Sequence, residues 1–81
     1  MLKDINNMNL KIEFSYEEDG RWIAEVIGLP VNGVCVYGTT QADATRKVKI
    51  LALQVIADLI EHEEMPEMDN IHFLIEIPHV A

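Results

Sequence analysis

The stretch that decides the fold is Leu10–Ile27, which reads LKIEFSYEEDGRWIAEVI. Its first half alternates apolar and polar side chains, with the period of two that is typical of a half-buried β-strand. Glu18-Asp19-Gly20 follows as a turn, in which the glycine is free to adopt a positive φ. A second apolar-rich segment over Arg21–Ile27 completes a β-hairpin.

Beyond the hairpin, the chain predicts three further elements. They are a short strand over 34–37, a helix over about 41–62 and a last strand over 71–77. Thr40 and Asp43 form a capping-box pattern at the start of the helix. Pro66 lies in a polar loop before the last strand, and Pro78 ends that strand.

The resulting order β-β-β-α-β predicts an α+β fold. One helix would pack on one face of a mainly antiparallel four-stranded sheet. A right-handed crossover through the helix would place the last strand parallel to the first and beside it. With 81 residues there is material for one core only, so we expect a single domain over 9–81 behind a loose leader over 1–8. Either Met1 or Met8 could be the natural start.

Charge and composition restrict the partners. Six basic and fourteen acidic residues give a net charge of -8, which repels nucleic acid and anionic lipid and attracts basic proteins. We therefore expect no direct binding to nucleic acid or membranes. A single cysteine and an N-terminus without an apolar core predict a cytoplasmic protein. A chain of this size has a small core, so burying more surface in a homo-oligomer would stabilise it.

The helix carries more apolar surface than one sheet needs. One stripe at helical spacing is expected to cover the sheet, and it consists of Ala44, Val48, Leu51, Val55 and Leu59. Further apolar side chains at Ile50, Leu53, Ile56 and Ile60 are expected mostly on the other side. Leu53, Ile56 and Ile60 are thus candidates for a self-association or partner interface. The alternative is that loops or the C-terminus cover them.

The hairpin tip is a second candidate interface. Glu17, Glu18 and Asp19 form an acidic turn, which is either a contact point for a basic partner or simply a polar turn. Trp22 follows it. A tryptophan here is either part of the core under the sheet or an aromatic anchor at an interface.

The sequence offers no recognisable catalytic or cofactor site. His62, His72 and His79 lack the spacing of metal ligands. His62 is expected to interact with the helix dipole, and Cys35 to be an inert packing residue in a short apolar strand. No nucleophile elbow, phosphate-binding loop or dinucleotide motif occurs. We therefore predict a protein that is not an enzyme and needs no metal or other cofactor.

The stretch from Glu18 to Val48 resembles the HicB-like antitoxin family. The matching pieces are an acidic-Asp-Gly hairpin, Trp22-x-Ala24-x-Val26, Leu29-Pro30, Gly33, Gly38 and Thr40-x-x-Asp43-Ala44. Val31-Asn32 separate the proline and glycine that the family commonly has adjacent, and Asp43 replaces a usual glutamate. The first departure lengthens a loop, while the second keeps the capping chemistry.

This resemblance implies a partial RNase H-like fold and a role in neutralising a small basic mRNA-cleaving toxin of the HicA type. Many members also carry a C-terminal DNA-binding segment, but this sequence ends at Ala81 directly after the last predicted strand, so DNA-binding autoregulation is not expected. Two alternatives remain. One is a stand-alone oligomeric domain with a structural or regulatory role. The other is a degenerate RNase H-like hydrolase, for which Glu13 and Glu25 are the best-placed carboxylates.

Overall fold

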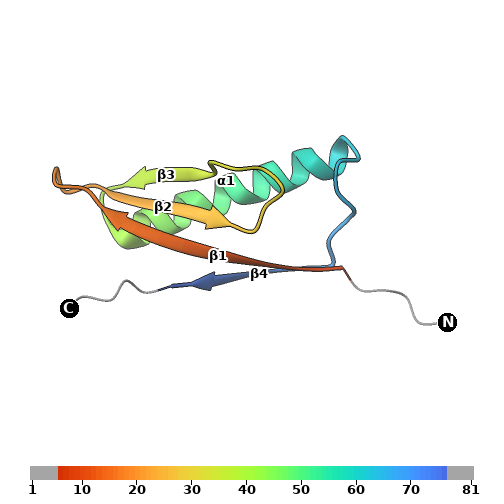
Figure 1. The fold of residues 1–81 in the computed structure, drawn as a ribbon, viewed down its shortest axis with the longest axis horizontal. Helices are drawn as coiled ribbons and strands as arrows, with labels where there is room; N and C mark the ends of the chain where they lie inside the picture. Colours follow the sequence, from red (N-terminus) through yellow and green to blue (C-terminus); the bar gives the residue numbers. More distant parts are fainter. Residues whose placement is uncertain (1–5, 77–81) are drawn as a thin grey trace.

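The fold follows the predicted order of elements (Figure 1). The structure is a computed structural model that describes residues 6–76. Its elements are β1 (Asn7–Tyr16), β2 (Trp22–Ile27), β3 (Cys35–Gly38), α1 (Gln41–Glu61) and β4 (Asn70–Ile75). The predicted α+β class, with one helix and a four-stranded sheet, is confirmed.

The sheet is mixed and has the strand order β3-β2-β1-β4. The pairs β1–β2 and β2–β3 are antiparallel, whereas β4 runs parallel to β1 along the outer edge (Figure 1). The expected position of the last strand, beside the first and parallel to it, is therefore confirmed. The helix makes the crossover between the two edges of the sheet.

The predicted loose leader over 1–8 is wrong for its last two residues. β1 begins at Asn7, and Asn7 and Met8 pair with Asn70 and Ile71 of β4. The Asn70 side-chain amide also donates to the side-chain oxygen of Asn7, 2.9 Å away. Because asparagine is uncommon in strands, the polar sequence concealed this pairing. Residues 1–5 lie outside the described residues.

Other boundaries shift by a residue or two. β2 begins at Trp22, and β3 covers Cys35–Gly38 where 34–37 was expected. Val34 is nevertheless buried, and its carbonyl accepts a hydrogen bond from the backbone N–H of Val26. β4 ends at Ile75, and the predicted end of this strand at 77–78 lies outside the described residues.

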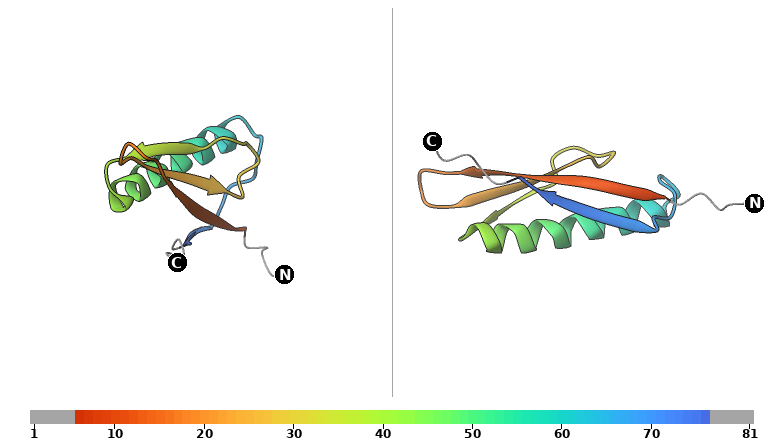
Figure 2. Two further views of the ribbon diagram at one scale, coloured as in Figure 1. Left: turned by 60° about the vertical axis from the view of Figure 1, so that its left-hand side comes forward. Right: turned by 90° about the horizontal axis from the view of Figure 1, so that it is seen from below.

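The core lies between α1 and one face of the sheet, which we call the inner face. The helix crosses β2 and β3, while β1 and β4 extend beyond it (Figure 2). The sheet contributes Leu10, Ile12, Ala24 and Val26, all buried. No polar or charged side chain is buried within residues 6–76, so packing of apolar side chains is the main stabilising interaction.

The helix buries a different stripe from the predicted one. The buried residues of α1 are Ala44, Val48, Ala52, Ile56 and Leu59. Leu51 and Val55, which were expected to face the sheet, are only half-buried. Each step of four residues turns the stripe by about 40°, so it winds around the helix as the helix crosses a twisted sheet.

Ile56 was predicted as an interface residue, and this prediction is wrong. Its side chain is only 2% exposed and belongs to the core cluster. Ile56 lies about 120° around the helix from Ala44 but only about 40° from Ala52, because contact with the sheet moves along the winding stripe. The sequence prediction assumed that one side of the helix faces the sheet along its whole length, whereas the sheet-facing side changes along α1.

Gly38 permits the tight connection from β3 into α1. A Cβ added at this position would lie 2.7 Å from the Cα and 2.8 Å from the Cβ of Ala44, and it would also contact the Ala44 nitrogen. Backbone atoms cannot move aside as a flexible side chain can, so only glycine fits here. This contact fixes the start of the helix against the sheet.

We expect Gly38→Ala to lower the free energy of unfolding by about 3 kcal/mol, because the added methyl group overpacks a backbone contact. Gly33→Ala is the matched control: φ is +81° there and no atom lies near the added Cβ, so only backbone strain of about 1 kcal/mol is expected. Urea unfolding of both variants measures the difference. Equal losses would contradict the close contact.

We expect Ile56→Ala to lower the free energy of unfolding by about 2–5 kcal/mol through the cavity it leaves. Leu53→Ala removes a side chain that is 46% exposed, and we expect it to cost less than about 1 kcal/mol in the monomer. Urea unfolding at low protein concentration compares the two. Similar losses would show that Leu53 is as much a core residue as Ile56.

Candidate protein-binding surfaces

The acidic hairpin tip is a well-ordered turn with part of its charge already paired. The Glu17 N–H donates to the Arg21 carbonyl and the Gly20 N–H to the Glu17 carbonyl, at 2.8 and 3.0 Å. One Asp19 carboxylate oxygen accepts from the Arg21 side-chain Nε at 2.7 Å, and the other accepts from the Arg21 backbone N–H. Of the three predicted tip residues, only Glu17 and Glu18 therefore keep carboxylates without an ion pair within residues 6–76.

Trp22 lies on the inner face and is half-buried against the core. Its ring packs edge-on against Phe14 and Tyr16, with ring centroids 6.4 and 5.0 Å apart. This packing favours the core role of the two considered for Trp22. The structure does not bring Trp22 together with Leu53 or Ile60, because Leu53 is exposed on the outer side of α1 and Ile60 is half-buried beside the core.

The sheet has a second face, which we call the open face, and no described element covers it. Strand register places side chains of all four strands in neighbouring rows on this face. One row joins Tyr37 to Ile23 and Ser15, and another joins Ile27 to Lys11 and Leu74. Tyr37 is 50% and Leu74 67% exposed. Apolar side chains thus reach solvent where a solvated sheet face would ordinarily be polar.

Between these two rows lie two carboxylates. Glu13 on β1 is the direct register partner of Glu25 on β2, and both are exposed. Like charges directly opposite each other on paired strands are destabilising. Neither carboxylate forms an ion pair within the part of the chain that the structure describes. A positively charged side chain docking here would relieve the repulsion.

The basic side chains nearest this pair are already engaged. Arg21 stacks over the Tyr37 ring at 4.2 Å from its centroid and pairs with Asp19. The Lys11 ammonium lies 3.8 Å from the Glu76 carboxylate. The centre of the open face is therefore negative, with Tyr37 and Ile23 on one side and Ile27 and Leu74 on the other.

Sequence reasoning missed this surface, although a signal was available. Ile23 and Ile27 occupy alternate positions of β2 with Glu25 between them, and the other alternate positions are already apolar. A strand that is apolar on both faces indicates contacts on both faces. Cys35 was expected to be an inert packing residue, yet it is exposed on this face opposite Glu25.

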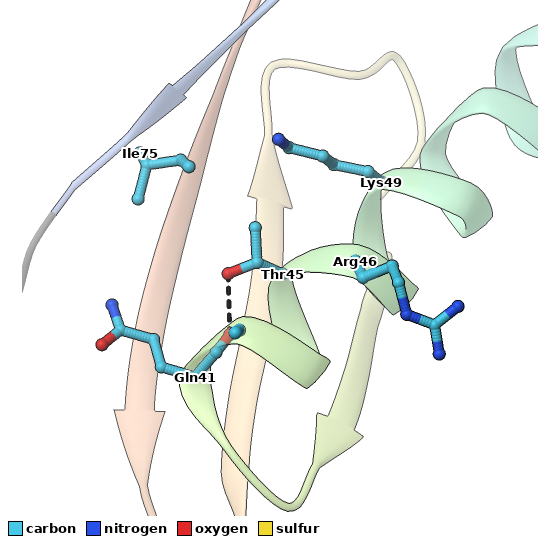
Figure 3. A pocket seen from close by; sticks show the side chains of 6 residues that line it. Gln41, Thr45, Arg46, Lys49 and Ile75 are labelled. Atoms are coloured by element: carbon cyan, nitrogen blue, oxygen red, sulfur yellow. Dashed lines mark hydrogen bonds between the residues drawn. The ribbon is translucent and has the colours of Figure 1, made fainter.

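A groove separates α1 from β4 on the other side of the sheet (Figure 3). It measures about 590 Å³ and is lined by Gln41, Ala42, Thr45, Arg46, Lys49 and Ile75. Lys49 extends across it, with its ammonium 5.7 Å from the Phe73 ring centroid, whereas Arg46 points to the opposite side. The Thr45 hydroxyl donates to the Gln41 carbonyl.

No group of three or more metal-ligating side chains lies together within residues 6–76. Glu13 and Glu25, the carboxylates considered for a hydrolase, face each other but have no third ligand beside them in that range. His79 lies outside the described residues. Over the same range, no helix combines the length and apolar content that a membrane span requires.

The C-terminal end of α1 is acidic and tightly closed. The Glu64 N–H donates to the Leu59 carbonyl and the Glu63 N–H to the Ile60 carbonyl, at 2.8 and 3.1 Å. Glu63 has a φ of +58°, a conformation in which glycine is usual. This closure holds Glu63 and Glu64 against the last turn of the helix, close to Glu61.

In comparisons with known proteins, no family model, no curated protein and no solved structure matches this chain.

His62 caps the helix, and we expect its stability contribution to depend on pH. Its Nδ1 lies 2.8 Å from the Asp58 carbonyl and 3.3 Å from the Asp58 carboxylate. The hydrogen bond to that carbonyl, and then the carboxylate charge, raise the pKa of His62 above its ordinary 6.5. A raised pKa in the folded state stabilises the fold below pH 6.5, and this stabilisation is lost as the pH rises through the folded-state pKa.

NMR titration of the His62 ring should give a folded-state pKa above 6.5. In Asp58→Asn the pKa should fall part of the way back, because the carbonyl remains while the charge is lost. A wild-type pKa at or below 6.5 would contradict the capping contact.

Proposed function

We propose that this chain is a HicB-like antitoxin-type module that binds and neutralises a small basic mRNA-cleaving toxin of the HicA type. The observation that supports this proposal is the open face. There the opposed carboxylates of Glu13 and Glu25 lie between rows that hold Tyr37 and Ile23 on one side and Ile27 and Leu74 on the other, on a face that no described element covers. A surface with apolar side chains around a central unpaired charge suits a protein partner of the opposite charge.

The motif residues behind the HicB resemblance have structural roles consistent with the proposed partial RNase H-like fold. Gly20 takes a φ of +90° in the hairpin turn, and Gly38 lets β3 approach α1. The Thr40 hydroxyl accepts from the Asp43 N–H, and the Asp43 carboxylate accepts from the Thr39 N–H, at 2.9 and 3.1 Å. The hairpin turn, the close contact of β3 with α1 and the helix cap all lie in the stretch from Glu18 to Val48 that carries the resemblance.

Charge supports a basic partner over other classes. With a net charge of -8, the chain would associate rapidly with a basic ribonuclease, and the attraction would weaken with added salt. An arginine of the toxin could lie between Glu13 and Glu25 while apolar toxin side chains contact Ile27 and Leu74. Neutralisation would then occur by contact, with no chemical step on this chain.

The experiment is affinity capture from the native host followed by an RNA-cleavage assay. Wild-type protein should capture a small basic protein that cleaves RNA, and should inhibit the cleavage. Glu25→Lys should weaken inhibition at least roughly tenfold, because it replaces an attractive charge with a repulsive one at the centre of the face. It should fold normally, since it also removes the repulsion with Glu13.

Glu67→Lys is the matched control. It makes the same charge change at an exposed position in the loop after α1, away from the open face, and inhibition should persist. Equal inhibition by wild type and Glu25→Lys would contradict the proposed surface. Metal-dependent RNA cleavage by the purified chain itself, abolished in Glu13→Gln, would contradict the proposed function.

A second candidate function, a stand-alone oligomeric domain, is favoured by a separate observation. Ile50 and Leu53 on the outer side of α1 remain exposed although they are large and apolar.

A further inference from the structure

The outer side of α1 carries a second apolar row, most of which is exposed. We call it the helix seam, and its members are spaced by three, four and three residues: Ile50, Leu53, Ala57 and Ile60. Ile50 is 44% and Leu53 46% exposed and Ala57 is exposed, whereas Ile60 is half-buried and also packs against the core. This alternation of three and four is the spacing with which one helix packs along another.

Charges of opposite sign lie at the two ends of the seam. Three basic residues precede it, namely Arg46, Lys47 and Lys49. Three glutamates follow its last residue, namely Glu61, Glu63 and Glu64. Arg46 and Lys47 both contact Asp43 within their own chain, at 3.8 and 3.0 Å. None of the three glutamates forms an ion pair within residues 6–76.

The charges are spaced symmetrically along the sequence about Val55, which marks the middle level of the seam but itself packs against the core. Arg46 and Glu64 are equally far from Val55, as are Lys47 and Glu63. Lys49 and Glu61 are also equally far from it, but the Lys49 side chain extends toward Phe73 of β4. Among the seam residues, Ile50 and Ile60 form such a pair, as do Leu53 and Ala57.

We propose that two copies of this chain associate through their helix seams, with the two α1 helices antiparallel about a two-fold axis at the level of Val55. Leu53 of each copy then faces Ala57 of the other, with Ile50 facing Ile60 on either side. Arg46, which points away from the groove beside β4, then lies near Glu64 of the second copy. A parallel pair would instead place Arg46 against Arg46 and Glu64 against Glu64.

A second copy fits this surface better than an unrelated partner. The same chain supplies both the apolar row and the complementary charge at each end, as an isologous interface requires. Pairing also buries apolar surface on a small domain, in which ten apolar residues of the range 6–76 are buried. The tight closure after α1 holds Glu63 and Glu64 near the helix end, where the second copy's Arg46 and Lys47 would lie.

The first test measures the mass of the purified protein alone, by sedimentation over a range of concentrations. Wild type should form a dimer, and Leu53→Glu should be a folded monomer. Leu74→Glu is the matched control, because it makes the same change at an exposed leucine of the open face, and it should still dimerise. A monomeric wild-type protein or a dimeric Leu53→Glu variant would overturn the proposal. If the wild type is monomeric, the helix seam would instead be a surface for a different protein.

The second test examines the antiparallel register with two single charge reversals. Arg46→Glu and Glu64→Lys each place like charges opposite each other twice in a homodimer, so each dimer should weaken roughly tenfold. An equimolar mixture of the two should recover a heterodimer of wild-type affinity, because both contacts become attractive again. A mixture that dimerises no better than the separate variants would overturn the register. Neither test requires the toxin, so failure here leaves the proposed antitoxin function untouched.

Discussion

The packing of α1 against the inner face of β2 and β3 is the interaction on which the rest of the structure depends. A winding line of small and branched side chains, from Ala44 to Leu59, brings the helix onto the sheet. Gly38 allows its first turn to meet β3 at a distance that no other residue permits. Because one helix covers one face, this contact leaves the other sheet face and the outer side of the helix available to solvent or to partners.

These two surfaces point in opposite directions and differ in character. The open face has opposed carboxylates with exposed apolar side chains on both sides, which favours a basic partner. The helix seam has an apolar centre with basic and acidic ends, which favours a second copy in antiparallel orientation. A dimer formed through the seam would keep both open faces accessible, so self-association and partner binding are compatible in this account.

Much of the fold could be predicted because its local signals agree. The alternation in Leu10–Tyr16, the turn at Gly20 and the cap at Thr40 each indicate one structure. The crossover rule then makes β4 parallel to one of the first three strands, and the expected place beside β1 is confirmed. Asn7 and Met8 were missed because their pairing depends on a distant strand rather than on local preference. Ile56 was misplaced because the line of helix burial follows the twist of the sheet, which a fixed helical wheel does not represent. The open face was missed because its members come from separate strands, and only the register brings Glu13 to Glu25 and Tyr37 to Ile23.

The central claim is that the helix seam and the open face are separate association surfaces. Backbone amide NMR of the purified wild-type protein during dilution tests it most directly. The account predicts shift changes along the outer side of α1, at Ile50, Leu53 and Ala57, while the amides of Ile23 and Ile27 on β2 stay unchanged. Changes concentrated on β2 and β3, or no change at any amide over the full range of concentrations, would contradict it.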